Sequence, residues 1–81
     1  MNNENNKVVT GDIKQATKIG CAIENMTMGE LAKKTGREGS TLSGILSRGT
    51  PSLKVAIDVL KGVKGTIIVR FDNGQEVELT V

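Results

Sequence analysis

The sequence of 81 residues lacks histidine, tryptophan and tyrosine, and has one residue each of cysteine, proline and phenylalanine. Without histidine, and with Cys21 as the single thiol, the usual zinc ligand sets and Cys-His nucleophile pairs are missing. We therefore expect no metal, no cofactor and no enzyme activity. A single cysteine cannot close an internal disulfide, which favours a reducing, cytoplasmic setting.

Long apolar runs are missing too. No stretch approaches the ~20 apolar residues that span a bilayer, and the asparagine-rich start lacks the apolar segment of a secretory signal. Residues 1–6 are polar and are expected to form a disordered arm, which leaves residues 7–81 as a single domain. Its core must be aliphatic and would be only marginally stable at this size.

The charges are unevenly distributed. Residues 7–64 carry ten Lys and Arg against five Asp and Glu, a net charge of +5, whereas residues 65–81 carry one Arg against three Asp and Glu, a net charge of −2. A basic segment suits contact with phosphate, and an acidic end is better placed away from nucleic acid. Lys14 and Lys18, one helical turn apart, could touch phosphate or could form an ordinary solvated face.

Capping signals and a 3.6-residue apolar period predict four helices. Their approximate bounds are residues 11–25, 28–35, 39–48 and 52–62. Thr10 or Asp12 would cap the first helix, and Ser52 would cap the fourth. The expected core face of the first helix comprises Ile13, Ala16, Ile19 or Gly20, and Ile23. That of the fourth comprises Leu53, Ala56, Ile57 and Leu60.

Residues 27–49 are the stretch around which the chain is organised. Thr27 and Glu30 make a T-x-x-E capping box, which predicts the start of a short helix. Gly36 can take the left-handed conformation that ends this helix. The next helix has small polar residues on one face and, on the other, Leu42, Ile45 and Leu46. The stretch therefore predicts two helices joined by a tight turn, with Gly49 as the final stop.

After Gly65 the apolar period changes to two residues, which predicts a β-hairpin over residues 66–81 and a mainly α fold with a C-terminal β-hairpin (α+β). A two-residue loop at Asn73 and Gly74 would mix charge into the apolar face. A three-residue loop that also includes Asp72, with Gly74 left-handed, avoids this. It places Phe71 opposite Gln75, Val69 opposite Val77, Ile67 opposite Leu79, and Arg70 opposite Glu76.

A two-stranded hairpin is marginal alone, so its apolar face needs a cover. The hairpin could pack on the first and fourth helices, or offer an open edge to a second copy and form an intermolecular sheet. Because the last strand ends at Val81 without a charged tail, we expect a homodimer through the hairpin. The interface would comprise Ile67, Val69, Phe71, Val77, Leu79 and Val81.

Several residues between 26 and 53 match the helix-turn-helix of the XRE family, which includes phage repressors and Cro proteins. They are Met26, Thr27, Glu30, Leu31, Ala32, Gly36, Ser40, Thr41, Leu42, Ser43, Ile45, Arg48, Gly49, Pro51, Ser52 and Leu53. Over roughly residues 13–62 the chain resembles this family. Thr35 and Arg37 depart from it, because the family usually places apolar residues beside the turn glycine. Residues 7–10 could form a short strand similar to that of small Cro proteins, or a plain lead-in.

The resemblance implies a four-helix repressor-like core and a transcriptional regulator, of a bacterium, phage or mobile element, that binds operator DNA as a homodimer. Helix 39–48 would lie in the major groove, with half-sites about one helical turn apart. Thr27 and the first amides of helix 28–35 would hold a phosphate. Arg37, Arg48 and Lys54 would contact the backbone. The full set implied to contact DNA is Thr27, Arg37, Glu38, Gly39, Ser40, Ser43, Gly44, Ser47, Arg48 and Lys54.

The groove-facing residues of this set include no Arg, Gln or Asn, the side chains that make bidentate bonds to bases. We therefore expect modest specificity, with Arg37 or Arg48 making any strong base contact and DNA shape adding to it. Two alternatives stay open. The protein could be the antitoxin of a toxin-antitoxin pair, or a helix-turn-helix scaffold used for protein-protein interaction without DNA.

Overall fold

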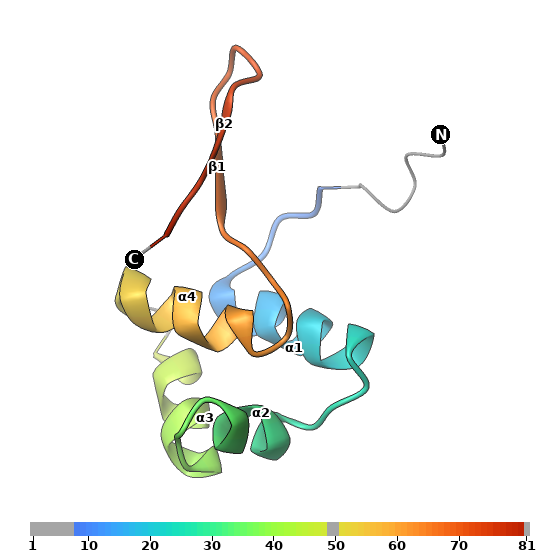
Figure 1. The fold of residues 1–81 in the computed structure, drawn as a ribbon, viewed down its shortest axis with the longest axis vertical. Coiled ribbons are helices and arrows are strands. Elements are labelled where there is room, and N and C mark those ends of the chain that lie inside the picture. Colours follow the sequence, from blue (N-terminus) through green and yellow to red (C-terminus); the bar gives the residue numbers. More distant parts are fainter. Residues whose placement is uncertain (1–7, 49–50, 81) are drawn as a thin grey trace.

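The computed structural model describes residues 8–48 and 51–80 of the chain. Its elements are α1 (Ile13–Ile23), α2 (Met28–Lys34), α3 (Gly39–Ser47), α4 (Leu53–Lys61), β1 (Ile68–Arg70) and β2 (Glu76–Glu78). The predicted fold class, mainly α with a C-terminal β-hairpin, is confirmed. The helices gather at one end and the hairpin extends from them at the other (Figure 1). The expected arm at residues 1–6, the stop at Gly49 and the end at Val81 lie outside the described residues.

Side-chain caps begin three of the four helices. The Asp12 carboxylate accepts from the Gln15 amide at 2.8 Å, and the Ser52 hydroxyl caps α4 at 3.2 Å. At α2 the capping box is complete, because Thr27 Oγ1 accepts from the Glu30 amide at 3.1 Å and Glu30 Oε1 accepts from the Thr27 amide at 2.8 Å. The cap residues themselves are not helical, so α1 and α4 begin slightly later than predicted.

Three helices end with one residue in the left-handed region, followed by an amide that reaches back five residues. The left-handed residues are Asn25 (φ 54°), Gly36 (φ 75°) and Lys64 (φ 60°). The returning bonds are Met26 to Cys21 at 2.9 Å, Arg37 to Ala32 at 2.7 Å, and Gly65 to Leu60 at 2.8 Å. This Schellman arrangement satisfies carbonyls that a helix end leaves free. The sequence predicted it at Gly36 alone, since asparagine and lysine are weaker signals of a left-handed residue.

The core lies where the four helices meet. Leu31 and Leu42 are completely buried, and Val59 exposes 1% of its surface. Around them are buried Cys21, Ala32, Leu46, Leu60 and Val63. Helix α2 packs on α3, and α1 contacts the other three helices. The hairpin adds Ile67, which is partly buried against this cluster. The stability of the fold therefore resides mainly in the helical unit.

The predicted core face of α1 was wrong in part. Ala16 is exposed, Ile19 and Ile23 are 43% and 73% exposed, and Thr17 and Cys21 are buried in their place. Thr17 can face the core because its hydroxyl donates to the Ile13 carbonyl at 2.7 Å. Gly20 allows a close approach, since a Cβ there would lie 2.5 Å from Val63 Cγ2. The helix is thereby turned so that its most apolar residues do not all point inward.

A similar correction applies to α4. Leu53, expected in its apolar stripe, is 50% exposed, whereas Ala56, Ile57 and Leu60 are buried as predicted. Val59 and Val63 are buried as well. The first turn of α4 thus lies at the edge of the helical unit, and the later turns enter the core.

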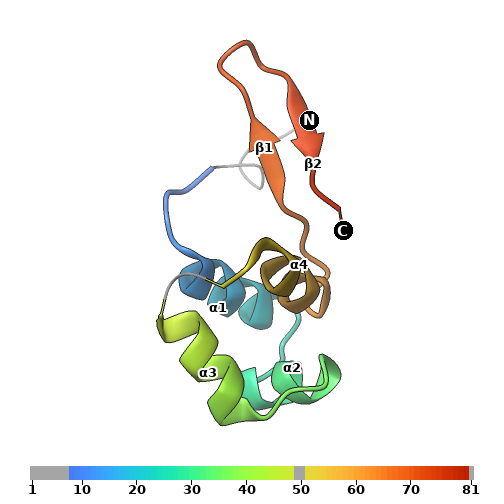
Figure 2. The same ribbon diagram turned by 90° about the vertical axis from the view of Figure 1, so that its left-hand side faces the viewer.

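The hairpin has the predicted register. Val69 lies opposite Val77, and the Arg70 guanidinium pairs with Glu76 at 2.9 Å. The Phe71 amide donates to the Gln75 carbonyl at 2.8 Å, which closes the three-residue loop, and Gly74 is left-handed at φ 92°. The strands stand clear of the helices (Figure 2). Residues 8–10 form no strand. The described part of this segment is therefore a plain lead-in to α1, the second of the two alternatives.

Candidate nucleic-acid interface

Helices α2 and α3 and the turn between them form the unit that the sequence singled out. Leu31 and Ala32 of α2 are buried against α3, which contributes Leu42 and Leu46. Ile45, predicted on the same apolar face, is half-buried. Because Leu42 and Leu46 point into the core and Ile45 is half-buried, the opposite face of the helix has only small residues to present.

That opposite face carries three exposed serines along about two turns of α3. They are Ser40, Ser43 and Ser47, with Gly39 before the first of them and Gly44 between the second and the third. The Arg48 guanidinium lies beside the helix, because a Cβ built on Gly44 would be 4.0 Å from Arg48 Nη2. Arg48 has no ion-pair partner among residues 8–48 and 51–80. A small hydroxyl-bearing surface with one cation lying along it can approach another molecule closely.

Thr27 is held in the capping box at the start of α2. Both the Thr27 backbone amide and the Thr27 hydroxyl bond to Glu30, and these bonds hold the pKa of the Glu30 carboxyl below its usual value. Thr27 is nevertheless exposed at the surface of the helical unit.

Arg37 has a partner within the protein. Its guanidinium bonds to the Asp58 carboxylate at 2.7 Å and to the Thr35 carbonyl at 3.1 Å, and its side chain is 20% exposed. This pair fastens the turn after α2 to α4. Lys54 is exposed and lines a hollow of about 240 Å³ that Arg37 and Asp58 also line. Arg37 and Lys54 thus lie together, but beside α4 and not on the serine face of α3.

Glu38 is exposed and serves as the N-cap of α3, although its side chain makes no capping bond. Of the residues predicted to contact DNA, the structure therefore gathers Glu38, Arg48 and the small residues of α3 on one helix. Thr27 lies at the start of the neighbouring α2.

The predicted site does not include two neighbouring lysines of α1. Lys14 and Lys18 of α1 line a hollow of about 260 Å³ together with Met28, Leu46, Ser43 and Ser47. Their four-residue spacing was the available signal. The sequence could not tell that this face of α1 lies against α3.

The predicted dimer residues differ in exposure. Ile67 and Leu79, nearest the helices, are partly buried, whereas Val69, Val77 and Phe71 are 36%, 42% and 51% exposed. Val81 lies outside the described residues. All of the described members belong to alternate positions of the paired strands and so share one face. The outer half of this face has no cover within the described chain.

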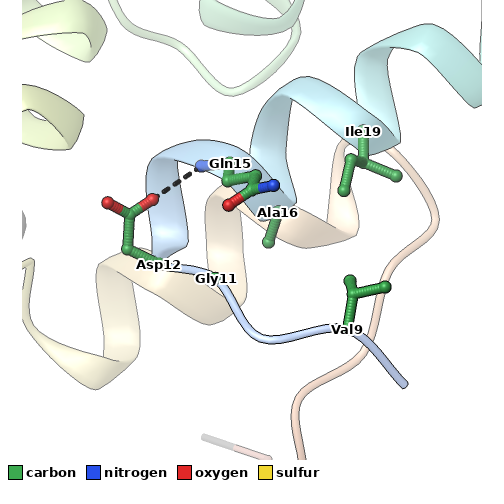
Figure 3. A pocket seen from close by; sticks show the side chains of 6 residues that line it. All are labelled: Val9, Gly11, Asp12, Gln15, Ala16 and Ile19. Carbon is green, nitrogen blue, oxygen red and sulfur yellow. Dashed lines mark hydrogen bonds between the residues drawn. The ribbon is translucent and has the colours of Figure 1, made fainter.

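A third hollow, of about 230 Å³, lies beside α1 and is mostly apolar (Figure 3). Val9 of the lead-in and Ala16 and Ile19 of α1 form its walls. The carboxylate of Asp12 lies at its rim, where it is bonded to the Gln15 amide as the cap of α1. The hollow thus offers shape and apolar contact, with its one acidic group already engaged.

The single cysteine lies in the buried core of the helical unit. Burial raises the pKa of the Cys21 thiol, which keeps this group in its unreactive protonated form. Residues 8–48 and 51–80 bring no three metal-ligating side chains together. Over the same residues no helix combines the length and apolar character needed to cross a membrane.

Comparisons of the chain with models of protein families, with curated proteins and with solved structures found no match.

Proposed function

We propose that this protein is a cytoplasmic transcriptional regulator of the repressor and Cro type that binds operator DNA through α3. The observation that supports this most is the exposed serine and glycine face of α3, which ends at Arg48 and adjoins the lysines of α1. A helix without bulky outward side chains can enter the major groove deeply, and the flanking cations suit its phosphate walls.

The specificity of this surface for particular DNA sequences would be modest. Serines make single hydrogen bonds to several bases, and the glycines make none with their side chains. Arg48 would supply the strongest base contact, because Arg37 is engaged by Asp58 at 2.7 Å. Sequence-dependent DNA shape would supply some of the remaining specificity.

The same proposal includes a homodimer through the hairpin, and the position of α3 restricts how it forms. Hairpin and α3 lie at opposite ends of the molecule (Figure 1). If two free strand edges paired antiparallel, the two-fold axis would run perpendicular to the strands. The two helical units would then lie at opposite ends of the dimer. Packing of two apolar faces, with the axis along the strands, would keep both α3 helices at one end. We therefore place the contact on the faces.

Charge also favours the faces over the edge of β2. The apolar face offers Val69, Phe71 and Val77, whereas Glu76 and Glu78 project from the other face of β2. Pairing two copies of this edge about Val77 would set Glu76 opposite the second Glu78, and like charges directly opposite each other are destabilising.

The exposed apolar face of the hairpin also supports a second candidate, the antitoxin of a toxin-antitoxin pair, with this face against the toxin. A partner protein that co-purifies in fixed stoichiometry would favour the antitoxin. A protein-interaction scaffold without DNA would show no DNA binding, or binding that does not respond to salt.

The proposed function is tested by fluorescence anisotropy with duplex DNA from upstream of the gene and with a scrambled duplex, at ~50 and ~200 mM salt. We expect tighter binding to the upstream duplex and a steep loss of affinity at the higher salt. Arg48→Ala should weaken binding to the upstream duplex by about 1 to 3 kcal/mol and reduce the preference over the scrambled one. Absence of binding to both duplexes by the wild-type protein would overturn the proposal.

A further inference from the structure

The hollow between α1 and α3 is lined by lysines, serines and apolar side chains. None of the other hollows described above has this combination. Lys14 and Lys18 lie along one wall, and Ser43 and Ser47 lie along the other. Each pair is spaced by four residues, so each spans about 6 Å along its helix. Met28 and Leu46 supply the apolar part of the lining. Two rows of hydrogen-bond donors therefore face one opening.

The charge of this hollow is not balanced within the described chain. No carboxylate lines it, and neither lysine has an ion-pair partner among residues 8–48 and 51–80. The hollow beside α4 is different, because Asp58 is part of its lining and pairs with Arg37. Both hollows are basic, but only the one between α1 and α3 lacks an internal anion.

The chemistry of the lining selects an anion with several acceptor oxygens. An ammonium offers three donors and a hydroxyl one, so lysines and serines together can surround a phosphate. Successive phosphates on one DNA strand rise by about 3.4 Å along the duplex axis. Because lysine side chains are long and flexible, the two lysines, about 6 Å apart along α1, can contact one phosphate or two neighbouring ones.

We propose that the hollow between α1 and α3 holds the phosphate backbone of duplex DNA, with Lys14 and Lys18 as the main contacts and Ser43 and Ser47 as additional donors. This rests on the proposed function and assigns it a backbone clamp. Because the hollow borders α3, a phosphate strand held there fixes the position and direction of that helix in the groove. Phosphate contacts carry no sequence information, so the clamp contributes affinity and orientation alone.

The test compares two double variants that lose the same charge. Lys14→Gln with Lys18→Gln removes the cations of the hollow, whereas Lys33→Gln with Lys34→Gln removes two exposed lysines of α2 that line none of the hollows described above. Affinity for the upstream and scrambled duplexes is measured by anisotropy across a salt series. All four lysines are exposed, so far-UV circular dichroism should show that both variants fold.

For each lysine removed, we expect the hollow variant to bind both duplexes roughly tenfold more weakly at ~0.1 M salt. The magnitude of the slope of log K against log salt should decrease by about two. The ratio of the two affinities should not change. The α2 variant should retain most of the wild-type affinity and slope.

Equal losses in the two variants would overturn the clamp, because they would indicate a general effect of charge. So would a hollow variant that binds like the wild type. Either result leaves the proposed function standing as long as the wild-type protein binds DNA. A wild-type protein that binds neither duplex overturns both.

Discussion

Leu31 and Leu42 of the helical unit are completely buried, whereas Val69, Val77 and Phe71 of the hairpin expose between 36% and 51% of their surface. Yet both regions adopt the local structure that their sequences predict. In the hairpin the turn sets the register, although the outer half of the apolar face has no cover within the described chain. In the helices the same kind of local signal is supported by a core. Local order and stability are therefore separate properties in this chain.

The largest expected effect comes from removing core volume. Leu31→Ala should lower the free energy of unfolding by about 3 to 5 kcal/mol, because it leaves a cavity in the buried core of the helical unit. Val69→Ala in the hairpin should cost less than about 1 kcal/mol in the monomer. Urea unfolding followed by far-UV circular dichroism measures both, since the chain has no tryptophan or tyrosine to report by fluorescence. A large effect of Val69→Ala that grows with protein concentration would mean that a second copy covers this face.

The second prediction concerns a substitution that should disrupt the hairpin and leave the helices intact. Gly74 has φ 92°, and a β-branched residue resists this region at a cost of about 1 to 2 kcal/mol. Gly74→Val should therefore remove the hydrogen-exchange protection of the Phe71 and Leu79 amides while helical amides keep theirs. Gly74→Asn, which tolerates positive φ better, should have a smaller effect. If Gly74→Val leaves hairpin protection and oligomeric state unchanged, the importance of this turn is refuted.

The third prediction concerns the junction of the two regions. Lys64 is left-handed at φ 60° in the turn that leads from α4 to the hairpin. Lys64→Gly removes the backbone strain of this conformation, whereas Lys64→Ala keeps it. Both variants lose equally the ion pair between the exposed Lys64 ammonium and the half-buried Glu24 carboxylate at 3.4 Å. Thermal unfolding should show the glycine variant about 1 kcal/mol more stable than the alanine variant. Equal stabilities would mean that this conformation carries no strain.

The smallest expected effect is a pH dependence of the α2 cap. The bonds from Thr27 lower the pKa of the Glu30 carboxyl in the folded state. Such a group stabilises the fold above the pKa of the unfolded chain and loses this contribution as the pH falls through the lower, folded value. The stability difference between wild type and Glu30→Gln should therefore be present at pH 7 and shrink below about pH 4.3. A difference that stays constant down to pH 3 would exclude the ionised cap as its cause.

Much of the fold could be predicted because its signals act within a few residues. The caps at Asp12, Thr27 and Ser52 each join a side chain to a backbone amide three residues away. The hairpin register followed from the parity of the apolar residues around Gly74. These interactions need no knowledge of the rest of the chain, so the helix order and strand pairing were available from the sequence.

The candidate site was less predictable, because it depends on which faces meet. The sequence placed the small residues of α3 on one face, since the apolar residues of that helix had to face inward. It did not show that Arg37 bonds to Asp58, 21 positions further along the chain. It also did not show that Lys14 and Lys18 lie across a hollow from Ser43 and Ser47.

By itself, the sequence determined the four helices, their caps and the hairpin register, because each rests on hydrogen bonds between near neighbours. The tertiary structure alone decided which face of α1 is buried. There Thr17 satisfies its hydroxyl on its own helix and Gly20 lets Val63 approach, so packing took precedence over apolar periodicity. That same rotation of α1 leaves Lys14 and Lys18 beside α3, a placement that no local pattern specifies.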